Sequence, residues 1–132
     1  MASDSSLFSP DRSNMFNVLL AFPEQVRHAV SIGEEAPFFA QTLSSNDVHV
    51  LGLGGSAIGG DLVRSYLQAT SGARTIRLTV SRNYSIPGTV NAESAVIASS
   101  YSGDTEETLS AYAEARRTTK NIMAIKIGRA HV

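Results

Sequence analysis

The stretch VHVLGLGGSAIGGD, residues 48–61, joins a short apolar run to a glycine-rich loop and then to a helical pattern. Val48 to Gly55 is β-branched and apolar and ends in glycines, which is typical of a buried strand followed by a tight turn. From Ser56 to Thr70, apolar residues recur at the intervals of a helix. They are Ile58, Leu62, Val63, Tyr66 and Leu67. The stretch therefore predicts a strand, a loop and a helix in direct succession.

The same order of elements repeats along the chain. Ala73–Val80, Ser94–Ser100 and a segment that begins at Asn121 predict further strands, and Asp104–Thr119 predicts a helix. The residues expected to share one face of that helix are Leu109, Tyr112 and Ala113. Because the strands are apolar on both faces and alternate with helices, we expect a three-layer α/β/α fold with a parallel sheet.

The segment before the first strand has a different pattern. Residues 1–10 are rich in serine and are expected to be disordered. A helical pattern then starts at Asp11 and stops at Gly33. Pro23 is expected to break this pattern after Phe22, which gives two short helices.

Composition narrows the class of protein. The chain has 132 residues, a net charge of −1 and no cysteine. We therefore expect one domain without disulfides, thiolate metal ligands or a nucleic-acid surface. Neither a membrane-spanning run nor a signal peptide is evident, so we expect a cytoplasmic protein without membrane partners. His49 lies within a strand and is expected to be a satisfied or edge histidine rather than a ligand.

Two loops rich in glycine and hydroxyl groups follow the first and third predicted strands. They are GLGGSAIGGD, residues 52–61, and SSYSGDTEE, residues 99–107. Ligands of an open parallel sheet bind beyond the carboxyl ends of its strands, and each loop leads into a helix N-terminus that favours an anion. Neither loop contains lysine or arginine. A phosphate bound there would therefore rest on hydroxyls and backbone amides.

Each loop also has a rival interpretation. The pattern G-x-G-x-x-A that begins at Gly52 satisfies a relaxed dinucleotide fingerprint, and Arg82 could accept the 2′-phosphate of NADP. Asp104 and Glu107 have the spacing of a capping box, which would do no more than start a helix. The capping box explains the carboxylates but not the serines, and a nicotinamide fold does not need hydroxyls after its third strand. The two loops together favour a phosphate site.

Three ordered motifs resemble a known family. GLGGSAIGGD, RNYSIP (residues 82–87) and SSYSGDTEETL (residues 99–109) are similar to the sugar isomerase (SIS) domain. They are closer still to the N-terminal half of the bifunctional phosphoglucose/phosphomannose isomerases. The resemblance covers residues 15–125 and implies a flavodoxin-like SIS domain over residues 11–125, incomplete at its C-terminus.

The resemblance also implies a set of site residues. In the family, the hydroxyls of the second loop hold a sugar phosphate, and the first loop lies against the sugar end of the substrate. The residues implied here are Gly54, Gly55, Ser56, Ser100, Ser102 and Thr105. Asp104 stands where the family usually has asparagine, and either residue can begin a helix.

The activity implied is interconversion of glucose 6-phosphate or mannose 6-phosphate with fructose 6-phosphate. The family needs no metal or other cofactor, and the resemblance implies a homodimer for the full-length protein. Its general base and its ring-opening histidine and lysine lie beyond this segment, so we assign no catalytic residue here. Two alternatives remain open, namely a non-catalytic SIS domain that senses a phosphosugar and an NADP-binding Rossmann domain.

The last residues of the chain match a translated sequencing adapter. IGRAHV, residues 127–132, is also the translation of a widely used DNA sequencing adapter, whose preceding bases complete the codon of Lys126. We expect residues 126–132 to be non-native and the native chain to have been cut at about Ile125. The encoding nucleotide sequence should then follow the adapter base by base over this segment. One synonymous codon that departs from the adapter would contradict this interpretation.

Overall fold

A computed structural model describes residue 11 and residues 13–36, 45–70 and 76–126. The chain divides between residues 39 and 40 into two compact units, which are described in turn. The predictions for residues 1–10 and 127–132 lie outside the described residues. Within the described ranges, no helix combines the length and the apolarity needed to cross a membrane.

The first unit contains the helices α1, Met15–Leu20, and α2, Phe22–Glu35. The Phe16 and Met15 amides donate hydrogen bonds of 2.8 Å to the Asp11 carboxylate. These bonds hold the pKa of Asp11 below its ordinary value. The predicted pair of helices is confirmed, but the break falls before Phe22, so that Pro23 lies in the first turn of α2, where a missing amide hydrogen costs nothing. The stop predicted at Gly33 is wrong, since α2 continues to Glu35.

The second unit is built on a parallel sheet. Its strands are β1, Asp47–Leu51, β2, Arg77–Ser81, β3, Ala95–Ser100, and β4, Ile122–Lys126. The strand order is β2-β1-β3-β4, and all three pairings are parallel. The predicted α/β fold with a parallel sheet is therefore confirmed. Lys126, predicted to begin the non-native tail, is the last residue of β4 and pairs with Ser100.

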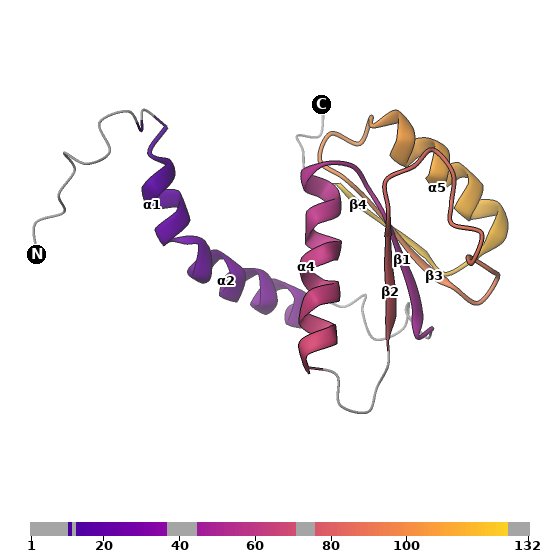
Figure 1. Ribbon diagram of the computed structural model, residues 1–132, viewed down its shortest axis with the longest axis horizontal. Coiled ribbons are helices and arrows are strands. Elements are labelled where there is room, and N and C mark those ends of the chain that lie inside the picture. Colours follow the sequence, from indigo (N-terminus) through magenta and orange to yellow (C-terminus); the bar gives the residue numbers. More distant parts are fainter. Residues whose placement is uncertain (1–10, 12, 37–44, 71–75, 127–132) are drawn as a thin grey trace, which may run out of the picture. The chain divides into compact units, whose positions relative to one another are not determined.

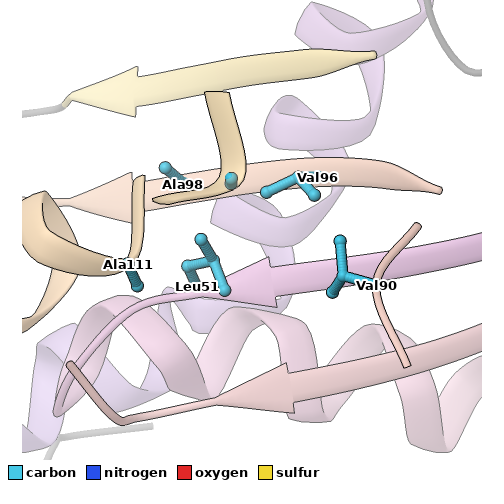
Figure 2. Packing of buried hydrophobic residues seen from close by; sticks show 6 residues of the cluster. Leu51, Val90, Val96, Ala98 and Ala111 are labelled. Carbon is cyan, nitrogen blue, oxygen red and sulfur yellow. The ribbon is translucent and has the colours of Figure 1, made fainter. Parts of the chain in front are cut away.

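Two helices cover opposite faces of this sheet (Figure 1). Helix α4, Gly55–Thr70, packs on β1 and β2, and α5, Glu106–Thr118, packs on β1 and β3. A Cβ at Gly60 of α4 would come within 3.0 Å of the Val80 side chain and 3.1 Å of the Val50 side chain. The absence of that carbon lets α4 approach the sheet closely. On the α5 face, a small cluster forms the core (Figure 2): Leu51, Val90, Val96, Ala98, Ala111 and Ala115.

Both helices pack through smaller residues than the periodicity predicted. The buried positions of α4 are Ala57 and Gly60. Four of its five predicted apolar residues are exposed instead: Ile58, Leu62, Val63 and Tyr66. On α5 the predicted face is right only at Tyr112, which is partly buried against the core. Leu109 is 48% exposed and Ala113 is exposed, and the fully buried residues are Thr108, Ala111 and Ala115. Small side chains allow backbone and sheet to lie close, so they occupy the interface although they contribute little to an apolar pattern.

A buried polar network lies near the amino ends of the strands. His49, on the interior strand β1, is completely buried, and its Nε2 lies 2.9 Å from Asp47 Oδ2. The same carboxylate oxygen accepts a hydrogen bond of 2.9 Å from the Ser94 hydroxyl. His49 Nδ1 has no hydrogen-bond partner among the described residues. The edge alternative is wrong, because β1 is an interior strand, and the expectation of a satisfied histidine holds for Nε2 but not for Nδ1.

Asp47 makes the stability of this network depend on pH. Burial alone would raise the pKa of Asp47, but hydrogen bonds from His49 and Ser94 and the positive charges of His49 and Arg77 lower it below its ordinary value of 3.8. Such a carboxylate stabilises the fold above its unfolded pKa, and the contribution is lost as the pH falls through the lower folded pKa.

We therefore expect Asp47→Asn to reduce the free energy of unfolding by about 1–3 kcal/mol near neutral pH. The deficit should shrink as the pH falls below about 4, because the wild-type carboxyl then becomes neutral too. Urea denaturation of both proteins over a pH series measures this difference. A deficit that stays constant down to about pH 2 would contradict the assignment.

Candidate functional site

The candidate site lies where the strand order reverses. The chain passes from β1 to β2 on one side and later returns to β3 on the other side of β1. The carboxyl ends of β1 and β3 are therefore neighbours, with Leu51 paired to Ala98. In open α/β sheets such a switch point is the usual place for a ligand, because the two loops diverge there and leave a crevice.

The two loops that leave these strands are in direct contact. The Tyr101 amide donates a hydrogen bond of 3.1 Å to the Ser56 hydroxyl oxygen. A Cβ at Gly52 would lie 3.0 Å from the Ser99 carbonyl oxygen, so glycine is needed for the strand ends to come this close. A cavity of about 430 Å³, open to solvent, lies between the loops. Its lining residues are Leu53, Gly55, Ser56, Tyr101, Ser102 and Thr105.

The structure brings most of the predicted residues to this cavity. Gly55, Ser56, Ser102 and Thr105 line it. Gly54 and Ser100 do not line it and instead shape the two loops. Gly54 has a φ of 54°, which a side chain tolerates poorly. Leu53 and Tyr101 also line the cavity but are not among the predicted site residues, which are all glycines, serines or threonine.

Backbone amides occupy one acceptor position on Ser100 and one on Ser102 in the second loop. Ser100 Oγ accepts a hydrogen bond of 2.9 Å from the Gly103 amide, and Ser102 Oγ accepts one of 3.1 Å from the Asp104 amide. Gly103 has a φ of 84°, and a Cβ there would come within 2.9 Å of the Lys126 side chain. The tight turn thus depends on a glycine whose open face is covered by Lys126.

This arrangement leaves hydroxyl hydrogens for a group outside the chain. Ser56 and Ser102 each accept from an amide, and no group in the described ranges accepts their hydrogens. Ser100 Oγ and Thr105 Oγ1, 3.1 Å apart, share one hydrogen and retain one. When Ser100 donates, the hydrogen that remains belongs to Thr105, which lines the cavity. A ligand group with several acceptor oxygens and no hydrogens of its own would suit these hydroxyl donors.

The start of α5 differs from the predicted capping box. The N-cap residue is Thr105 rather than Asp104, and no side chain caps the helix through it. The Thr105 hydroxyl is turned to Ser100 instead, as the 3.1 Å contact shows. Glu106 and Glu107 lie in the first turn, where their negative charges suit the helix dipole. With Thr105 engaged elsewhere, the first amides of α5 add to the positive potential beside the cavity.

The carboxylates of the first turn of α5 act on Tyr84, in the turn after β2, rather than on the cavity. The negative charge of Glu107, with smaller effects of burial and of Glu106, raises the pKa of Tyr84. Neither glutamate lines the cavity. The turn that carries Tyr84 is also joined to α5 by a hydrogen bond of 2.9 Å from the Ile86 amide to Glu114. Glu114 therefore holds the turn after β2, and no carboxylate is among the residues that line the hydroxyl cavity.

Arg82, which the dinucleotide alternative requires, is already paired. Its guanidinium donates to the Asp61 carboxylate, whose other oxygen accepts a hydrogen bond of 2.9 Å from Arg64. Asp61 thus joins α4 to the end of β2. The arginine that supported the NADP alternative is therefore paired with Asp61 in this structure.

The fold and the cavity define an α/β protein with a candidate anion site at the switch point of a parallel sheet. The chain is 41% identical over 114 residues to a bifunctional phosphoglucose/phosphomannose isomerase of Caldicellulosiruptor bescii. The match covers 86% of this chain and 33% of that isomerase, so the chain spans about one third of the length of this curated relative. No family model and no solved structure matches the chain. The chain is a partial homologue of that isomerase.

The glycines of the first loop should respond to alanine in opposite ways. Gly54→Ala places a side chain at a positive φ and should lower the free energy of unfolding by about 1 kcal/mol. Gly55 lies in α4 with open space around its missing Cβ, so Gly55→Ala should be neutral or stabilise by up to about 0.5 kcal/mol. Thermal and urea unfolding measure both changes.

Gly59→Ala provides the matched control, because Gly59 lies inside α4 and also has open space at its Cβ. It should stabilise the chain by about 1 kcal/mol. A Gly54→Ala variant as stable as the wild type would contradict the strained turn.

Proposed function

We propose that this chain is an SIS domain, spanning residues 11–125, that binds the phosphate of a phosphorylated sugar. The whole protein would be an isomerase that interconverts glucose 6-phosphate or mannose 6-phosphate with fructose 6-phosphate. The observation that carries the phosphate assignment is the set of free hydroxyl hydrogens on Ser56, Ser102 and the Ser100–Thr105 pair. The partial homology to a phosphoglucose/phosphomannose isomerase supports the substrate class.

The chemistry of the cavity suits a phosphate ester. Its terminal oxygens only accept hydrogen bonds, and hydrogen bonds to a charged acceptor are stronger than neutral ones. Helix α5 begins at the cavity, so its amides and dipole also favour a dianion. None of the lining residues is charged, and the phosphate is held by oriented neutral donors.

The proposed reaction needs more than this cavity provides. Isomerisation between an aldose and a ketose moves a proton between two adjacent carbons, which requires a general base. No lining residue is a carboxylate or an imidazole, and Glu107 is engaged with Tyr84. We propose that this chain holds the substrate and that the base comes from another part of the protein or from the second subunit of a homodimer. No metal or other cofactor enters this scheme.

The proposal predicts that Ser102→Ala weakens binding of glucose 6-phosphate about tenfold or more, because a hydrogen bond to a charged oxygen is lost. The thermal stability should change little, since Ser102 is exposed. Titration of the chain with the phosphosugar, followed by NMR chemical shifts, measures the affinity. Ser110→Ala, an exposed serine on α5 outside the cavity, is the matched control and should bind like the wild type. Unchanged affinity in Ser102→Ala would contradict the phosphate-binding role of Ser102. The serine would then only shape the loop through its bond with the Asp104 amide.

The same titration separates phosphosugar binding from dinucleotide binding. Glucose 6-phosphate, mannose 6-phosphate and fructose 6-phosphate should each shift the amides of Ser56 and of residues 100–105. Shifts caused by NADP but not by fructose 6-phosphate would overturn the proposed function in favour of a dinucleotide site.

A further inference from the structure

Tyr101 is a large, exposed aromatic residue in the middle of the hydroxyl loop. Tyr101 is 68% exposed, although it lies between Ser100 and Ser102, whose hydroxyls both accept hydrogen bonds from backbone amides. It lines the cavity together with Leu53, which is 38% exposed. An aromatic residue and a leucine thus share a cavity with the hydroxyl donors. Phosphate binding by the hydroxyls does not explain why these two large side chains line the same cavity.

The backbone around Tyr101 is held at three points. The Tyr101 amide donates to Ser56, the Gly103 amide donates to Ser100, and the Asp104 amide donates to Ser102. The aromatic ring is therefore attached to a loop that loses little conformational entropy when a ligand binds. A side chain presented on such a loop binds a ligand at a lower entropic cost than one on a mobile segment.

The cavity also has more room than a phosphate fills. Its volume is about 430 Å³, and binding sites for small molecules combine an apolar or aromatic wall with a few fixed polar groups. A sugar ring or open sugar chain has C–H groups that can lie against an aromatic face, whose negative charge distribution attracts their hydrogens. The hydroxyl donors suit the phosphate end of a phosphosugar, and the carbon surface suits the other end.

We propose that Tyr101 is a specificity-determining residue whose ring packs against the sugar part of the ligand, with Leu53 extending the same apolar surface. This inference rests on the proposed function. It separates the site into a hydroxyl part that recognises any phosphate and an aromatic part that recognises the carbohydrate. Tyr101 contributes to affinity for the phosphosugar but not for phosphate alone.

Two other exposed tyrosines show what is particular about Tyr101. Tyr66, on α4, is 67% exposed, and Tyr84 is 55% exposed. Neither lines the cavity, and Tyr84 is engaged with Glu107. Tyr66 is therefore a control of equal exposure and equal size that lies away from the proposed ligand.

The test compares the whole chain with Tyr101→Ala, Tyr101→Phe and Tyr66→Ala in NMR titrations with glucose 6-phosphate and, separately, with inorganic phosphate. Tyr101→Ala should weaken glucose 6-phosphate binding about tenfold and change phosphate binding less than about twofold. Tyr101→Phe keeps the ring and should bind both ligands like the wild type. Tyr66→Ala should also bind both normally. Normal phosphate binding by Tyr101→Ala itself shows that the variant is folded.

The outcomes distinguish the inference from the function on which it rests. If the wild type binds glucose 6-phosphate and Tyr101→Ala binds it equally well, or loses both ligands to the same extent, the role of Tyr101 is overturned and the proposed function stands. If the wild type binds inorganic phosphate no more weakly than glucose 6-phosphate, the sugar adds no affinity and the inference fails. If the wild type binds neither ligand, both proposals fail.

Discussion

The hydrogen bond from the Tyr101 amide to the Ser56 hydroxyl is the contact on which the candidate site depends. It joins the loop after β1 to the loop after β3, which are 45 residues apart in sequence. It can form only because β1 and β3 are adjacent and parallel and because Gly52 lets the strand ends approach each other. A hydroxyl that closes the two loops in this way uses its acceptor position, so its hydrogen stays available for a ligand.

The parallel sheet and the place of the site could be predicted from the sequence. Strands that are apolar on both faces and alternate with helices leave few arrangements other than a covered parallel sheet. The carboxyl ends of parallel strands lie at one edge of the sheet, so the loops that follow the first and third strands are expected at that edge. The sequence therefore predicts that the glycines and serines of both loops contribute to one site. Ser56 and Ser102 do line one cavity.

The packed faces of the helices and the helix cap could not be predicted in the same way. The periodicity of large apolar residues on α4 marks its exposed side, because contact with the sheet is made by Ala57 and Gly60. Asp104 has a good capping side chain, but the cap is decided by a contact with Ser100, which draws in the Thr105 hydroxyl. Both outcomes depend on the distance between elements, and a local pattern contains no information on that distance.

The two ends of the sheet show how the same groups can serve structure or binding. At the amino end, the Ser94 hydroxyl accepts from the Asn91 amide and donates to Asp47. The Thr119 hydroxyl likewise donates to the Ser94 carbonyl oxygen at 2.8 Å. At the carboxyl end, Ser56 and Ser102 also accept from amides, but no chain group in the described ranges receives their hydrogens. A buried network that consumes its own donors stabilises the fold, whereas a surface network that keeps them is prepared to bind. The distinction rests on where each hydrogen goes, and residue type alone would have given both ends the same role.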